Sequence, residues 1–109
     1  MTDAIPELVR ACGFDELAEG ATLLVTVRQR EVALVRIGDD VFALQDACPH
    51  KGGPLCEGTV SVQRGELICP WHRFRFDLRS GASVTNPQLV AKTFPVEVRE
   101  NGVFIRLEI

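Results

Sequence analysis

The sequence predicts an all-β fold, and two patterns along its 109 residues support this. No segment carries apolar residues at a sustained spacing of about 3.6, as a helix with one buried face would. Short runs rich in Val, Ile, Leu and Thr recur instead, and turn-forming residues separate them. The length is that of one ordinary domain, so residues 1–109 are expected to form a single unit.

The first half of the chain predicts an edge strand and then an antiparallel meander. Its expected strands are β-branched and apolar, and they cover residues 8–12, 22–27, 32–37 and 41–44. Its expected connections are polar or turn-like, and they cover residues 14–20 (with one helical turn begun at Asp15), Gln29–Arg30 and residues 38–40. The meander leads the chain through Asp46 and Ala47 to Cys48.

The second half predicts two hairpins around an irregular loop. The first hairpin has strands at 59–62 and 67–68, joined by a turn at 63–66. In residues 73–78, Phe74, Phe76 and Leu78 alternate with polar residues, which predicts a strand with one buried face. After a proline-containing loop at 83–88, the expected closing strands are 90–99 and 103–107, joined by the turn signal Asn101–Gly102.

Composition narrows the functional classes. The net charge of −3 and the lack of a basic run argue against a nucleic-acid partner. No apolar stretch approaches the roughly 20 residues of a membrane span, and the N-terminus lacks the basic and apolar parts of a signal peptide. We therefore expect a cytoplasmic protein without a membrane partner. In that compartment the four cysteines are better explained as metal ligands than as disulfides, and Cys12, which has no partner motif, as a small buried residue.

Two short segments contain a cysteine followed closely by a histidine. Cys48 precedes His50 by two residues, Cys69 precedes His72 by three, and these are the only two histidines in the chain. Thiolates suit iron–sulfur clusters and zinc, and imidazole suits iron and zinc. A [2Fe–2S] cluster with two Cys on one iron and two His on the other is one solution, and a structural Cys₂His₂ zinc site in a non-redox binding module is another. Zinc fingers usually pair Cys with Cys and His with His, which disfavours the second solution.

These segments, with the Gly52-Gly53-Pro54 that follows the first, resemble the two cluster-binding loops of the Rieske family. The resemblance implies one [2Fe–2S] cluster held by Cys48, His50, Cys69 and His72. It also implies a Rieske fold of antiparallel sheets, with a small cluster-binding subdomain at about residues 46–80. A family member that keeps the fold and binds nothing is disfavoured, because all four ligands are present. In the family a proline loop covers a third side of the cluster, so Pro87 either has that role or shapes a turn.

Departures from the pattern indicate the subclass. Respiratory members carry a disulfide between the two loops, and the matching positions here are Gly53 and Trp71. Their Ser and Tyr, which donate hydrogen bonds to the cluster, are replaced by Phe74 and Phe76, so a potential towards the lower end of the range of about −150 to +300 mV is expected. Catalytic oxygenase subunits need further histidines for a second iron site, and none remain.

The chain is thus similar to the soluble ferredoxins of bacterial multicomponent oxygenases. That similarity implies a one-electron carrier, not an enzyme, which accepts electrons from a flavin-dependent reductase and passes them to a terminal oxygenase. The same motifs are similar to the small subunit of assimilatory nitrite reductase, whose acceptor would be the large subunit. Lys51 and Arg73 lie next to the two histidines, with Arg75 and Arg79 nearby. These cations either steer an acidic partner or belong to an ordinary solvated face.

Overall fold

The computed structural model describes residues 7–49, 52–71, 73–84, 86 and 88–107. It confirms the all-β class: the described residues form ten strands and two single-turn 3₁₀ helices, and all strand pairs are antiparallel. No helix of the described part is long and apolar enough to cross a membrane.

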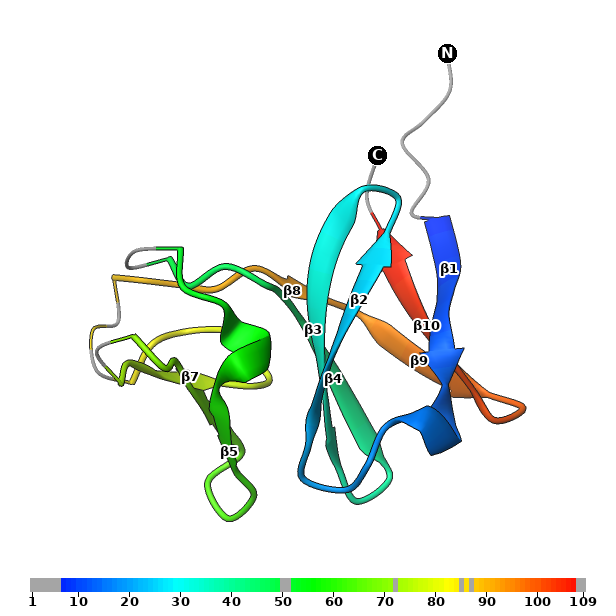
Figure 1. Cartoon of the computed structure of the whole chain (residues 1–109), viewed down its shortest axis with the longest axis horizontal. Helices are drawn as coiled ribbons and strands as arrows, with labels where there is room; N and C mark the ends of the chain where they lie inside the picture. Colours follow the sequence, from blue (N-terminus) through cyan, green and yellow to red (C-terminus); the bar gives the residue numbers. More distant parts are fainter. Residues whose placement is uncertain (1–6, 50–51, 72, 85, 87, 108–109) are drawn as a thin grey trace.

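The described strands form three sheets. Figure 1 shows the one with the fewest residues, which contains β5 and β7 and is called the small sheet below, to one side of the other two. The first sheet has the order β1-β10-β9, formed by β1 (Glu7–Gly13), β10 (Gly102–Leu107) and β9 (Val96–Arg99). The second has the order β2-β3-β4-β8, formed by β2 (Thr22–Val27), β3 (Arg30–Ile37), β4 (Asp40–Gln45) and β8 (Thr93–Phe94). The third has the order β5-β6-β7, formed by β5 (Thr59–Ser61), β6 (Glu66–Ile68) and β7 (Arg75–Asp77). The helical turns are η1 (Phe14–Glu16) and η2 (Leu55–Glu57).

The four-stranded sheet separates two hydrophobic cores, and β3 contributes to both. Its residues Val32 and Leu34 pack with the sheet of β1, whereas Ala33 and Val35 belong to the core shared with the small sheet. Side chains alternate between the faces of a strand, so a strand that is covered on both sides needs a continuous apolar run. This is why residues 32–35 are all apolar and all fully buried.

Two tight hairpin turns lie one residue earlier than the sequence predicts. The turn between β2 and β3 is formed by Arg28 and Gln29, with φ of 50° and 68°, because Arg30 is already paired with Val27. The turn between β9 and β10 is formed by Glu100 and Asn101, and Gly102 pairs with Arg99. Two-residue hairpin turns of this type require positive φ at both central residues, and strand register decides which two they are.

The predicted strand 90–99 is wrong as a single element. Pro95 has no amide hydrogen to donate to a ladder, and the chain divides there into β8 and β9, which belong to different sheets. The other predicted strands are confirmed within one or two residues, including the edge position of β1 and the half-buried or buried state of Phe74, Phe76 and Leu78. The helical turn predicted from Asp15 begins at Phe14.

Candidate cluster-binding site

The first ligand loop leaves the end of β4 and turns back on itself around Cys48. The Cys48 amide donates to the carbonyl of Gly53 (2.8 Å), and the Cys48 carbonyl accepts from the amide of Gly52 (2.6 Å). Gly52 has a φ of +76°, a left-handed conformation that glycine adopts at little cost. The Cys48 side chain is consequently fixed with only 2% of the residue exposed.

The second ligand loop connects β6 to β7 as the tip of a hairpin. The Cys69 amide donates to the carbonyl of Phe74 (2.8 Å), and the strands begin their pairing directly below, at Ile68 and Arg75. Arg73 has a φ of +56°, which is unusual for a residue with a side chain. Cys69 is completely buried.

The two loops bring the sulfur atoms of Cys48 and Cys69 together. The Cys48 thiol is close enough to that of Cys69 to influence its pKa, and both residues belong to the core between the four-stranded sheet and the small sheet. Burial raises the pKa of Cys69 to about 11, the backbone N–H of Trp71 opposes this, and the Cys48 thiol adds to it. A metal that binds here must therefore displace a proton from the thiol.

This arrangement fits the thiolate half of the implied cluster. In a Rieske centre, one of the two irons is bound by two cysteine thiolates. The adjacent buried sulfurs of Cys48 and Cys69, which come from two separate loops, can supply these two ligands. The predicted imidazole half, His50 and His72, lies outside the described residues, as do Pro87 and Lys51. All four cysteines of the chain are free thiols, and Cys12 lies buried in the other core.

Gly53 and Trp71, the positions that correspond to the respiratory disulfide, lie against one another. A Cβ atom on Gly53 would come within 2.8 Å of Cδ2 of the indole ring. The ring thus packs on the bare backbone of the first loop, although 48% of Trp71 remains exposed. A contact between a glycine and an aromatic ring joins the loops at the place where respiratory relatives are expected to use a covalent bond.

The basic residues near the second loop have different surroundings. Arg73 is exposed. The Nε of Arg75 lies 3.6 Å from Oε1 of the buried Glu66, so Arg75 is engaged within the small sheet. The guanidinium of Arg79 lies over the ring of Phe42, 5.8 Å from its centroid. Among the described basic residues near the second loop, Arg73 is thus the best candidate for a surface contact with an acidic partner.

Sequence reasoning missed a group of polar contacts beside the first loop. The Asp46 carboxylate accepts hydrogen bonds from the backbone amide and the thiol of Cys56, and the Thr22 hydroxyl donates to the Cys56 carbonyl. From the sequence, Asp46 only leads the meander into the first ligand loop, and Cys56 has no predicted partner. Ten residues separate Asp46 from Cys56, so no local capping pattern signalled the contact.

Comparison with known proteins agrees with this geometry. The chain matches the family model of the Rieske [2Fe-2S] domain over residues 7–98. The ferredoxin component of a naphthalene 1,2-dioxygenase system from Pseudomonas putida is 30% identical over 100 residues, covering 91% of this chain and 94% of the relative. These matches do not support the alternative of a zinc-binding module.

Solved structures show the same likeness. The ferredoxin of carbazole 1,9a-dioxygenase from Nocardioides aromaticivorans IC177 superposes with a TM-score of 0.85 at 31% identity, covering 94% of this chain and 97% of that one. A ferredoxin–oxygenase complex of carbazole 1,9a-dioxygenase contains a chain with a TM-score of 0.80 at 29% identity, covering 90% and 91%. A Mycobacterium tuberculosis protein assigned as an NADH-dependent nitrite reductase small subunit gives a TM-score of 0.85 at 25% identity, covering 94% and 96%. We conclude that this chain belongs to the Rieske [2Fe-2S] domain family, that its cofactor is one Rieske-type [2Fe–2S] cluster, and that it is an electron-transfer component and not a catalytic subunit.

Proposed function

We propose that this chain is a ferredoxin that accepts single electrons from a flavin-dependent reductase and passes them to a terminal oxygenase. The observation that carries the proposal is the meeting of Cys48 and Cys69 in one buried site of a chain whose likeness to oxygenase ferredoxins spans more than nine-tenths of its length. The likeness to the ferredoxin in a complex with its oxygenase supports an oxygenase as acceptor.

In this proposal Cys48 and Cys69 bind one iron, and His50 and His72 bind the other. The cluster supplies one-electron chemistry, and four protein ligands leave neither iron open to a substrate. The chain's own task is to hold the sulfurs of Cys48 and Cys69 in place and to exclude water from them, and their burial serves both ends. Residues 46–80 form the cluster-binding subdomain, and the protein acts in the cytoplasm, where thiols stay reduced.

The second candidate is the small cluster-bearing subunit of a nitrite reductase. The likeness to the assigned M. tuberculosis small subunit, with the same TM-score as the oxygenase ferredoxin, favours it specifically. A free carrier and a bound subunit differ in behaviour. A carrier supports turnover of an oxygenase when it is added as a separate protein, whereas a subunit copurifies with a large sirohaem-containing chain.

The first experiment is spectroscopic. Anaerobically purified protein is expected to be red-brown and to give, after reduction with dithionite, an EPR signal of the Rieske type. A redox titration is expected to give a midpoint potential below about 0 mV, within the lower part of the Rieske range. A colourless protein that contains zinc would overturn the proposal. Electron transfer to a purified oxygenase, compared with transfer to a nitrite reductase large subunit, then separates the two acceptors.

A further inference from the structure

The two ends of the first ligand loop are joined by one side chain. Asp46 lies just before Cys48, and Cys56 lies in η2 just after the loop. Oδ1 of Asp46 accepts from the Cys56 amide at 2.6 Å, and Oδ2 accepts from the Cys56 thiol at 3.4 Å. Burial, followed by the hydrogen bond to Asp46, raises the pKa of Cys56 to about 11, so the thiol retains its proton and can act as donor.

The same two residues are tied to the four-stranded sheet. The backbone amide of Asp46 donates to the carbonyl of Glu31 in β3 (2.9 Å). The hydroxyl of Thr22 in β2 donates to the carbonyl of Cys56. The start and the end of the loop are therefore both fastened to neighbouring strands, and the carboxylate connects the two fastened points.

The first loop needs such a connection because no strand pair among the described residues closes it. The second loop lies on the ladder of β6 and β7, which holds its two ends together. The strand before the first loop, β4, pairs with β3 and β8, and the chain after the loop enters η2. Within the described part of the loop, the backbone of Cys48 is otherwise held by its hydrogen bonds with Gly52 and Gly53.

We propose that Asp46 is a positioning residue, whose carboxylate clasps the first ligand loop through Cys56 and thereby holds Cys48 in place for the cluster. The proposal rests on the proposed function, since it assumes Cys48 as a ligand. The negative charge of Asp46 has a second effect. A carboxylate close to the loop disfavours the added negative charge of the reduced cluster, so it lowers the reduction potential.

The test compares three variants of the full chain with the wild type. Asp46→Ala removes both acceptor oxygens, Asp46→Asn keeps one oxygen and removes the charge, and Asp39→Asn is the charge-matched control at an exposed turn. We expect Asp46→Ala to lose iron to a chelator about tenfold faster, as befits the loss of a hydrogen bond to a charged acceptor. We expect Asp46→Asn to recover part of this retention and to have a more positive midpoint potential, and Asp39→Asn to match the wild type in both.

Hydrogen exchange of the Cys56 amide in the metal-free chain gives an independent readout. It is expected to be at least several-fold faster in Asp46→Ala than in the wild type, because the amide loses its acceptor. The proposal is overturned if Asp46→Ala retains iron and protects the Cys56 amide as well as the wild type does. If the wild-type protein binds no iron, the proposed function fails, whereas amide exchange still decides whether the clasp exists. If Asp46→Ala does not fold, Asp46→Asn decides instead: iron retention and Cys56 amide protection that both equal those of the wild type overturn the proposal.

Discussion

The loops that begin at Cys48 and Cys69 share a backbone arrangement. In each, the cysteine amide donates to the carbonyl five residues further on, and the residue four positions on, Gly52 or Arg73, has a positive φ. Their supports differ. The first loop uses glycine at the left-handed position and a side-chain clasp, whereas the second places an arginine there and relies on the β6–β7 ladder. A ladder that fixes both ends of a loop can thus offset a left-handed arginine, which costs about 1 kcal/mol.

The comparison is tested most strongly at the cysteines themselves. Replacing either Cys48 or Cys69 by Ala is expected to abolish cluster binding to the same extent, because each loop supplies one of two adjacent sulfurs. Iron and sulfide content and the visible spectrum measure this. Cys12→Ala, which removes a buried thiol from the other core, should retain the cluster. A Cys69→Ala variant that stays red-brown would show that the two loops are not equivalent.

The loops are next distinguished by the residue five positions after the cysteine, which is Gly53 in one and Phe74 in the other. Gly53→Ala places a Cβ within 2.8 Å of the Trp71 ring, so we expect the unfolding free energy to fall by about 1–3 kcal/mol. Urea unfolding followed by circular dichroism measures the loss. The fluorescence of Trp71, the one tryptophan in the chain, reports the displaced ring.

A double variant provides the control for that prediction. Trp71→Ala removes the ring with which the new Cβ would clash. In a Trp71→Ala background, Gly53→Ala should therefore lower the unfolding free energy much less than it does when the indole is present. If Gly53→Ala lowers the unfolding free energy equally with and without the indole, the packing explanation is refuted.

The left-handed positions give a smaller and asymmetric effect. Gly52→Ala should lower the unfolding free energy by about 1 kcal/mol, because a Cβ is disfavoured at a φ of +76°. Arg73→Gly relieves that strain in the second loop but adds about 0.5–1 kcal/mol of chain entropy cost, so its net effect should be close to zero. Denaturant titrations of both variants test this. A large loss in Arg73→Gly would indicate that the arginine side chain stabilises its loop by contacts of its own.

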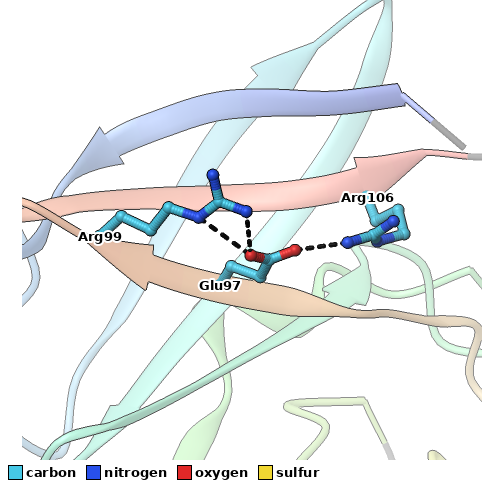
Figure 2. A network of polar contacts seen from close by, with 3 residues as sticks. All are labelled: Glu97, Arg99 and Arg106. Carbon is cyan, nitrogen blue, oxygen red and sulfur yellow. Dashed lines mark hydrogen bonds and ion pairs between the residues drawn. The ribbon is translucent and has the colours of Figure 1, made fainter.

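The smallest effect is expected away from both loops, in the ion-pair network of β9 and β10. Figure 2 shows Glu97 between Arg99 and Arg106, and hydrogen bonds from Arg99 and then Arg106 hold the pKa of Glu97 below its ordinary 4.5. A depressed pKa means that the stabilisation is present above pH 4.5 and is lost as the pH falls through the folded-state value. Glu97→Gln should therefore be slightly less stable than the wild type near neutrality and equal to it in acid.

Two measurements complete that prediction. The difference in unfolding free energy should shrink with added salt, since exposed ion pairs are screened. Cluster content at neutral pH should be unchanged, because these residues lie in the β1-β10-β9 sheet, whereas Cys48 and Cys69 belong to the core on the other side of the four-stranded sheet. A stability difference that is independent of pH would rule out the ion pairs as its cause.

Much of the fold is predictable because it depends on local patterns. The alternation around Phe76 and the apolar run at 32–35 report burial directly. The predicted positions of the β2–β3 and β9–β10 turns are one residue too late. The residues near Arg28 and Asn101 do not determine the register in which the flanking strands pair. The division at Pro95 was missed because the residues on both sides are good strand formers, and only sheet membership separates them.

The candidate site was likewise predictable only in part. Spacing alone identified Cys48 and Cys69, and the structure places them together. The clasp between Asp46 and Cys56 was not predictable, because it joins residues whose proximity is a result of the loop they enclose. The packing of Trp71 on Gly53 also depends on tertiary structure and was not predicted. The glycine at position 53 nevertheless indicates that another group approaches the backbone closely there.

The pairing of β4 with β8 has a consequence for protein engineering. Gln45 and Lys92, which flank the whole segment 46–91, are joined by a hydrogen bond of 2.8 Å from the amide of Gln45 to the carbonyl of Lys92. The segment leaves the remaining sheets and returns to them at a single place, which is the geometry that tolerates insertion and exchange best. It can therefore be regarded as a transplantable cassette. A homologous segment with another potential could be spliced between these two residues without a change in the length or register of the host strands. The side chains of β2 and β3 that contact the segment, such as Thr22, Ala33 and Val35, would have to match it.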